Sequence, residues 1–426
     1  MNEYNSIYKL KAVNKNCAGI DVHKEFVCVT TLCGSEDNIL MDYHKFRTTK
    51  AELHKLKELL LNQNIKVVGI ESTGKYWYPV YNALHEVINL NVYNARHIKN
   101  IPGKKTDKAD SEWIARTTRF SELRPSFIPC ERIRKTRSLS RIRKDFLQKR
   151  SGVRQLIHGY LEQSSIKIGS VLSDVFGVSG RNLLELLVRY KNIHPKAVAE
   201  CLHGSLQNKL DEVLLAMDGY MDDDYRYAFK LLLGMEQRIS EAIKDTEAKL
   251  KSMLITNESE QKTLARLTTI PGVSNLSAML ILAEVGFDLN SFPDEDHFSS
   301  WAGLAPGKHE SAGKNKTGKI QVRKSHFRTL LVELALSASR TKGTYCSVKY
   351  RILRARSGPQ KATISIAHHL AKAIYMIIKH SQEYKELGGD HFSKVNANST
   401  KKRIEKMIDQ VGVDVFKEYL TENHLI

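Results

Sequence analysis

Four carboxylates in the first quarter of the chain stand where phosphate chemistry needs them. Asp21 and Glu71 each end a short apolar run that predicts a strand, whereas Asp107 and Asp110 lie three residues apart at the start of an expected helix and so share one face of its first turn. A negative cluster is costly unless cations neutralise it, and oxygen ligands favour Mg²⁺ or Mn²⁺. Two such ions, about 4 Å apart, can stabilise both oxygens of a phosphodiester exchange.

Each of these carboxylates also has an ordinary structural explanation. An aspartate at a strand end is common, Asp107 could cap its helix, and Asp110 suits the positive end of that helix. Taken singly, each residue favours the structural explanation. The order of all four, each at the expected end of its element, favours a metal-binding catalytic set.

A serine in a cationic loop forms the second candidate site. Ser311 lies in the sequence Glu-Ser-Ala-Gly-Lys of residues 310–314, inside the Gly/Lys-rich stretch 307–320. Nearby cations could stabilise the negative charge that develops if this serine attacks phosphorus. Composition alone favours an ordinary loop serine.

The elements that would position these residues alternate between strand and helix. Strands are expected at 17–21, 26–32, 38–46, 66–70 and 90–93, and helices at 51–61, 78–87 and 107–118. An antiparallel opening followed by strand and helix alternation is an α/β pattern of the ribonuclease H type.

The middle of the chain is expected to be helical. Apolar residues from Leu139 to Tyr160 recur every three or four positions, with an interruption at Lys149, and a poorer stripe that includes Met235 and Ile239 runs through 225–254. The two helices could form an antiparallel coiled coil or a dimer contact, or be ordinary amphipathic helices. Residues 165–225 read as helical and carry no recognisable function.

The last third combines a glycine turn with further helices. Residues 270–273, Ile-Pro-Gly-Val, lie between helical stretches at 260–267 and 275–285, as in a helix-hairpin-helix. Such a turn either binds phosphate through exposed N–H groups or is a plain structural turn. Apolar helices are expected at 327–338 and 362–380.

The charge of the chain indicates a polyanionic partner. Its 426 residues, enough for two or three domains, carry 66 Lys and Arg against 47 Asp and Glu, a formal charge of +19. Windows 96–154 and 308–361 each have a net charge of +12, from 18 cations against 6 acids and from 14 against 2. This predicts nucleic-acid binding. The residues assigned to it are Lys105, Arg116, Arg134, Arg141, Lys314, Lys316, Lys319, Arg323 and Lys324.

Other features exclude several classes of protein. The first 16 residues lack the apolar core of a secretory signal, and no apolar stretch approaches the roughly 20 residues of a membrane span. Six scattered cysteines without a Cys-x-x-Cys pair favour a reducing cytoplasm over a disulfide framework or a thiolate zinc site. No nucleotide-binding P-loop is present.

A series of motifs resembles one family in order and spacing, from about residue 17 to 390. They are Gly19-Ile20-Asp21, Glu71-Ser72-Thr73-Gly74, Lys105-Thr106-Asp107-Lys108-Ala109-Asp110, Ile270-Pro271-Gly272-Val273, Gly303-Leu304-Ala305-Pro306 and Glu310-Ser311-Ala312-Gly313. The chain resembles the DEDD insertion-sequence transposases, bridge-RNA-guided recombinases with a RuvC-like domain and a C-terminal transposase domain.

This resemblance implies a function more specific than the composition does. The four acidic residues would bind divalent metal, and Ser311 would form a covalent phosphoserine intermediate with DNA. A noncoding guide RNA would pair with donor and target DNA, and one protomer's acidic site would work with another's serine in a tetramer of two dimers. Localisation would be in a prokaryotic cytoplasm, at the nucleoid.

The resulting prediction is an RNA-guided DNA transposase with four regions. They are a RuvC-like α/β domain (1–125), a helical or coiled-coil region (126–262), a mainly helical transposase domain with the serine loop (263–390) and a tail (391–426). One alternative is a RuvC-like junction endonuclease that uses water as its nucleophile. Another is a non-catalytic nucleic-acid scaffold.

Overall fold

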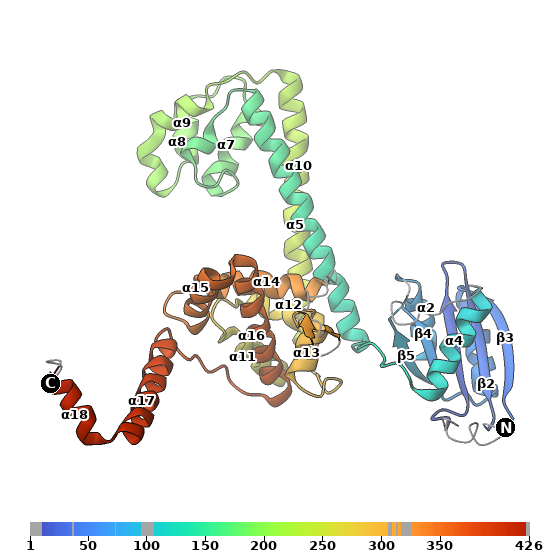
Figure 1. The fold of residues 1–426 in the computed structure, drawn as a ribbon. Coiled ribbons are helices and arrows are strands. Elements are labelled where there is room, and N and C mark those ends of the chain that lie inside the picture. The colour runs from blue at the N-terminus through green and yellow to red at the C-terminus, as the bar shows by residue number, and fades with distance from the viewer. Residues whose placement is uncertain are drawn as a thin grey trace. The chain divides into compact units, whose positions relative to one another are not determined.

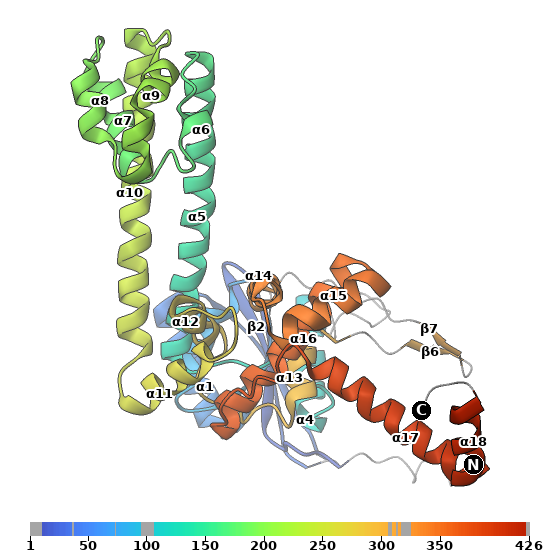
Figure 2. The same ribbon diagram turned by 90° about the vertical axis from the view of Figure 1, so that its left-hand side faces the viewer.

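The computed structural model describes residues 11–35, 38–72, 74–94, 106–305, 309–311, 314–316 and 325–422. The chain divides into two compact units, Met1–Ile128 and Pro129–Ile426, called here the sheet unit and the helical unit. Figures 1 and 2 show the described elements from two directions. The finer division of the second unit remains a prediction.

The sheet unit contains a mixed five-stranded sheet in the order β3-β2-β1-β4-β5. β1 (Cys17–Val22), β2 (Phe26–Cys33) and β3 (Leu40–Arg47) are antiparallel neighbours, whereas β4 (Val67–Glu71) and β5 (Asn89–Tyr93) continue in parallel from β1. The described residues of this unit form the helices α1 (Lys50–Asn62), α2 (Trp77–Leu84) and α4 (Asp107–Phe120). The antiparallel opening followed by strand and helix alternation is confirmed, and it is compatible with a ribonuclease H-like fold.

Strand alternation divides the sheet unit into two layers of packing. Ala18 and Ile20 of β1 and Val68 and Ile70 of β4 join the apolar core formed with α1 and α2. The intervening residues face the opposite side, because successive side chains of a strand alternate between faces. That side is covered by α4, which contacts β1, β2 and β4.

The helical unit is built on a long antiparallel pair, α5 (Glu131–Gln163) and α10 (Asp223–Leu254), drawn side by side in Figure 2. A cap lies between them in sequence and shares an apolar core with one end of each long helix. Its elements are α6 (Ile168–Val171), α7 (Val178–Arg189), α8 (Pro195–Cys201), the 3₁₀ helix Gly204–Lys209 and α9 (Leu210–Met217). The expected long helices are therefore confirmed, although the first begins eight residues earlier than the predicted start at Leu139.

The predicted apolar stripe of α10 is confirmed in part: Ile239 packs against the apolar core and Thr246 is buried, but the burial expected at Met235 is displaced by one residue. Met235, which the pattern placed in the contact, is 50% exposed, whereas Glu236 is 1% exposed. The buried positions include Phe229, Ile243 and Leu250 at seven-residue spacing with Glu236 between them. An acidic residue occupies this position because arginines of α5 and α7 bind it.

The rest of the helical unit packs around α16. Its helices are α11 (Glu258–Thr268), α12 (Asn275–Val285), α13 (Glu295–Trp301), α14 (His326–Arg340), α15 (Tyr345–Ser357) and α16 (Pro359–His380), with a short hairpin of β6 (His309–Ser311) and β7 (Lys314–Lys316). The predicted tail holds α17 (His391–Val411) and α18 (Val413–Glu422). Within the described residues, no helix combines the length and apolarity that a membrane crossing requires.

Candidate metal centre

The two strand-end carboxylates lie on the same face of the sheet. β1 and β4 are parallel neighbours with Ile20 beside Ile70, so Asp21 and Glu71 follow directly at equivalent positions. By alternation both belong to the face that α4 covers. Asp21 is 5% exposed and Glu71 7% exposed.

The first turn of α4 supplies the other two carboxylates. Thr106 caps this helix: its Oγ1 accepts a hydrogen bond from the backbone N–H of Ala109 at 3.2 Å. Asp107 and Asp110 follow within the first turn, where negative charge suits the helix dipole. The capping role considered for Asp107 is therefore wrong, because Thr106 is the cap, whereas Asp110 does lie at the positive end of the helix as expected. The same turn also brings both residues into the electrostatic environment of Asp21.

Two glycines let α4 lie directly on the sheet. Gly19 and Gly69 are paired across β1 and β4. A methyl group on Gly19 would overlap the backbone of α4 at Ser111 and Ala115, and one on Gly69 would overlap the Thr118 side chain. The absence of side chains at these two positions thus sets how close α4 comes to the strand ends.

A buried hydrogen bond fastens the same helix to β2. The Oγ1 of Thr30 and the Oγ of Ser111 are 2.8 Å apart, and Ser111 also donates to the carbonyl of Lys108 at 2.9 Å. Ser111 is fully buried and Thr30 is 1% exposed. Because Ser111 directly follows Asp110, this contact holds the part of α4 that carries Asp110 against the sheet.

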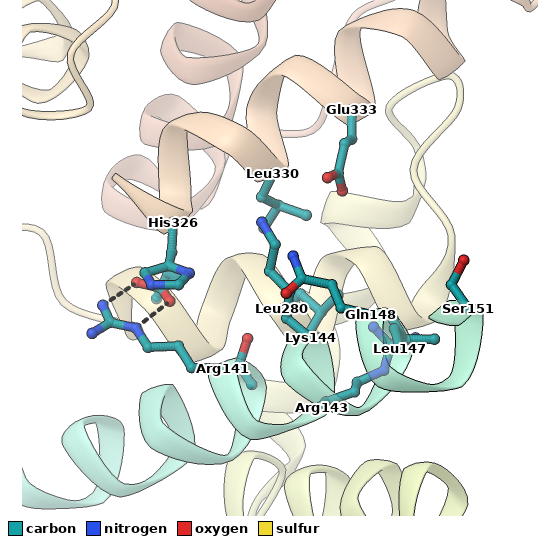
Figure 3. Close-up of a pocket in the computed structure, with 12 residues that line it drawn as sticks. Arg141, Arg143, Lys144, Leu147, Gln148, Ser151, Leu280, His326, Leu330 and Glu333 are labelled. Atoms are coloured by element: carbon teal, nitrogen blue, oxygen red, sulfur yellow. Dashed lines mark hydrogen bonds and ion pairs between the residues drawn. The ribbon is translucent and has the colours of Figure 1, made fainter. Parts of the chain in front are cut away.

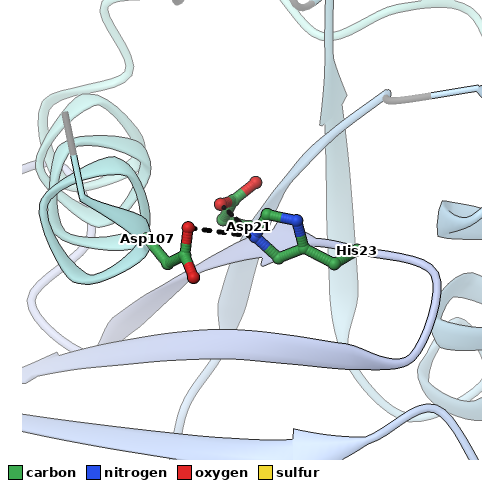
Figure 4. A group of neighbouring side chains, drawn as sticks. All are labelled: Asp21, His23 and Asp107. Carbon is green, nitrogen blue, oxygen red and sulfur yellow. Dashed lines mark ion pairs between the residues drawn. The ribbon is translucent and has the colours of Figure 1, made fainter.

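His23 is a member of the site that the sequence prediction missed. Its Nε2 lies 3.0 Å from Oδ2 of Asp21 and 3.4 Å from Oδ1 of Asp107, as Figure 4 shows. This nitrogen is buried, but neither contact has hydrogen-bond geometry. The sequence feature that could have indicated His23 is its position two residues after Asp21, at the start of the hairpin turn.

Burial and like-charge repulsion act in the same direction on Asp21. Burial raises the pKa of the Asp21 carboxyl above its ordinary value, and the nearby His23 opposes that rise. The other three carboxylates add to it by like-charge repulsion. Among ion pairs of the described residues, none joins Asp21, Asp107 or Asp110 to a lysine or arginine.

The donor set fits a divalent cation. Asp21, His23 and Asp107 each offer one ligand atom, and these three atoms lie within 4.8 Å of one another. Carboxylate oxygens are the ligands that Mg²⁺ and Mn²⁺ prefer, and a cation here would relieve the repulsion felt by Asp21. Glu71 and Asp110 contribute charge to the same environment.

The second candidate site is described only in its backbone. Ser311 ends β6 and pairs with Lys314 at the start of β7, while Lys316 pairs with His309. Lys105, Lys319, Arg323 and Lys324 lie outside the described residues. The catalytic role of the serine and the nucleic-acid role of these cations stay predictions.

Three arginines assigned to nucleic acid have partners within the protein. Arg116 pairs with Glu112 at 2.7 Å and keeps a side chain that is 60% exposed. Arg134 is 7% exposed and donates to the carbonyl of Pro129. Binding of nucleic acid by Arg134 would require this buried guanidinium to move.

The third of these arginines lines a cavity. Arg141 pairs with the buried Glu284 at 3.3 Å, beside a cavity of about 330 Å³ between α5, α12 and α14. Figure 3 shows His326, the first residue of α14, beside Arg141, and Lys144 also lines this cavity. Burial lowers the pKa of His326, and the charges of Arg141 and Lys144 lower it further.

The glycine turn at 270–273 is packed inside the helical unit. Gly272 has a φ of +83°, and a methyl group there would come within 2.6 Å of the backbone nitrogen of Ala338 in α14. Ile270 and Val273 are buried on either side. These contacts support the structural reading of the turn.

Comparison with known proteins identifies two matching segments. Residues 18–166 match the DEDD transposase model named for IS110, and residues 264–351 match the model of the transposase IS116/IS110/IS902 family. The cap, whose apolar core also includes residues of α5 and α10, lies between these segments.

Curated relatives match over shorter stretches. The transposase of insertion sequence element IS1328 from Yersinia enterocolitica is 32% identical over 113 residues, 26% of this chain and 32% of its own length. A Sinorhizobium fredii protein named as transposase y4pF/y4sB is 29% identical over 129 residues, which are 29% of this chain and 33% of its own length. A Pseudomonas aeruginosa protein named as a family 20 transposase is 25% identical over 126 residues, 29% of this chain and 37% of its own length. The matches thus span about a third of each relative.

Proposed function

Because this chain belongs to the IS110 family of DEDD transposases, we propose that it cuts and rejoins DNA as the transposase of an insertion sequence. The observation that carries the proposal is the convergence of Asp21, Asp107 and His23 in a site where neighbouring carboxylates repel one another. This site lies in the segment that matches the DEDD model.

The acidic cluster would hold Mg²⁺ or Mn²⁺ through Asp21, Glu71, Asp107 and Asp110. A bound divalent ion supplies positive charge that polarises the scissile phosphate and stabilises the leaving oxygen. The chain's own contribution is to fix the ligands. Thr106 holds the first turn of α4, and Gly19 and Gly69 let that turn reach the strand ends.

Ser311 would be the nucleophile of a transesterification. Its Oγ bonds to phosphorus, the bond from phosphorus to one deoxyribose oxygen breaks, and the proton lost by the serine ends on that released oxygen, directly or through solvent. Attack by the hydroxyl of another strand reverses these changes and regenerates the serine. One phosphodiester is exchanged for another, so no high-energy cofactor is consumed.

The partners follow from the same proposal. Double-stranded donor and target DNA are the substrates, and a noncoding guide RNA selects them by base pairing while the protein grips backbones. The formal charge of +19 supports contact with polyanions. One protomer's acidic site and another's Ser311 would act together in a tetramer of two dimers, in the cytoplasm at the nucleoid.

A denaturing-gel search for a protein–DNA adduct tests the reaction. The full chain is co-expressed with its native flanking DNA as wild type, Ser311→Ala and Asp21→Ala. Ser252→Ala serves as the matched control, because Ser252 is exposed and its Oγ bonds only to the carbonyl of Lys249 in its own helix. We expect an adduct in the wild type and the control and none in the other two variants.

Two other results would replace the proposal. Strand cutting without an adduct, retained by Ser311→Ala, would make the protein a RuvC-like endonuclease in which water attacks. The location of the described metal-site residues wholly within the sheet unit is the observation that favours this second candidate. Nucleic-acid binding that needs no metal and is unchanged in Asp21→Ala would indicate a non-catalytic scaffold.

A further inference from the structure

The imidazole of His23 is held in place by the turn between β1 and β2. The His23 backbone N–H donates to the carbonyl of Phe26 at 3.0 Å, which closes the hairpin. The His23 and Phe26 rings pack with their centroids 4.6 Å apart, and the Nζ of Lys45 lies 3.6 Å from the centroid of the Phe26 ring. Backbone and ring contacts thus restrict where the imidazole can point.

The imidazole points into the acidic cluster. Its side chain as a whole is 37% exposed, but Nε2 is buried and faces Asp21 and Asp107 (Figure 4). The buried nitrogen lies 3.0 and 3.4 Å from two carboxylate oxygens, without hydrogen-bond geometry to either. This is the arrangement expected of three ligand atoms that surround one metal ion. Simple ion pairing would favour aligned N–H to oxygen bonds.

We infer that His23 supplies a nitrogen ligand to the divalent cation of this site, and that the site therefore prefers Mn²⁺ to Mg²⁺. This inference rests on the proposed metal-dependent function. Mg²⁺ takes oxygen ligands almost exclusively and holds its waters tightly, whereas later divalent metals accept imidazole with increasing affinity. A nitrogen donor consequently adds more to the binding of Mn²⁺ than to that of Mg²⁺.

Pulsed electron paramagnetic resonance of Mn²⁺ bound to the wild-type chain tests the ligand directly. We expect a ¹⁴N coupling from a directly bound imidazole. Bound Mn²⁺ without ¹⁴N coupling would overturn the inference and leave the carboxylate metal site intact. Because this measurement uses the unaltered protein, it does not depend on whether a variant folds.

His23→Phe tests the preference, since phenylalanine keeps the packing on Phe26 and removes the nitrogen. We expect the variant to bind Mn²⁺ about tenfold or more weakly, with a smaller change for Mg²⁺, measured by titration of free Mn²⁺ and by competition. His85→Phe is the matched control, because His85 packs on Tyr81 of the same unit with ring centroids 5.2 Å apart. Equal Mn²⁺ affinity in both variants would overturn the inference.

Asp21→Asn separates this inference from the proposed function. Loss of Mn²⁺ binding in Asp21→Asn with full retention in His23→Phe refutes only the histidine ligand. No Mn²⁺ binding by the wild type, or binding unchanged by Asp21→Asn, refutes the metal site itself and with it both proposals.

Discussion

Buried carboxylates have opposite surroundings in the two units of this chain. In the helical unit, Glu236 accepts hydrogen bonds from Arg154 at 2.8 Å and Arg181 at 2.7 Å. Burial alone would raise its pKa, but the two guanidinium groups lower it. In the sheet unit, Asp21 is nearly as buried, and burial together with neighbouring carboxylates raises its pKa.

The difference separates carboxylates that stabilise the fold from carboxylates that need a ligand. The glutamates that face α5 receive their cations from the chain itself: Glu236 from Arg154, Glu247 from Arg143 and Glu260 from Arg132. Among the described residues, the groups that act on Asp21 are a histidine and further acids. A buried negative charge without an internal cation is the signature expected of a cation site.

The largest expected effect is on catalysis by the sheet unit. Asp21→Asn should lower the strand-cleavage rate by at least about 100-fold, because it removes a proposed metal ligand. It should not lower the melting temperature in the absence of metal, since it relieves repulsion. Parallel rate and melting measurements with Asp245→Asn, an exposed carboxylate on α10, provide the comparison. A large loss of stability would mean that Asp21 is a structural residue like Glu236.

The reverse result is expected for the helical unit. Glu236→Gln should reduce the free energy of unfolding by about 3 kcal/mol, because two arginines lose their shared counter-charge. The measurement is a urea denaturation of the full chain. Glu241→Gln, on an exposed face of the same helix, should change it by less than about 0.5 kcal/mol. Equal effects of the two substitutions would show that Glu236 contributes no more to stability than an exposed glutamate.

Acid should weaken the helical unit through Glu260. Hydrogen bonds from Arg132 lower the pKa of this carboxyl from 4.5 to about 2. Because the pKa is lower in the folded state, its contribution is present above about pH 4.5 and is lost as the pH falls towards 2. The advantage of wild type over Glu260→Gln in urea titrations should shrink by up to roughly 3 kcal/mol over this range. A constant advantage would contradict the assignment.

The smallest effects concern the glycines. Gly19→Ala should cost about 1 to 3 kcal/mol and move the first turn of α4, because the new methyl group overlaps the helix backbone. Gly152→Ala, within α5 and with open space around it, should instead stabilise by about 0.5 to 1 kcal/mol. Thermal denaturation of both variants measures these two changes in stability. An unchanged stability in Gly19→Ala would show that α4 can shift freely.

Local patterns in the sequence were sufficient for the elements that hold the acidic residues. Alternation and leucine spacing placed the five strands and the helices of the sheet unit within a few residues, because each pattern follows directly from which face is buried. The helices α13 and α15 and the β6–β7 hairpin were not predicted as such, since they are short or bury few apolar side chains.

Counting charges along the sequence did not reveal which cations are paired within the protein. The basic window 96–154 predicted nucleic-acid binding, which stays a prediction, and five of its arginines pair with acids from other helices: Arg132, Arg137, Arg141, Arg143 and Arg154. Their partners are 82 to 147 residues away in sequence, as the separations of the hydrogen bonds from Arg154 and Arg137 show. A count of charges along the chain cannot detect such neutralisation.

The sequence by itself determined the order of the acidic motif, the strand ends that carry Asp21 and Glu71 and the helix start that carries Asp107, because these depend on local periodicity and capping. Only the tertiary structure decided that paired glycines bring that helix onto the sheet and that His23 points between two aspartates. It also decided that Glu236 and not Met235 faces α5. These depend on contacts between residues distant in sequence, where a side chain's partner, and not its type, sets its role.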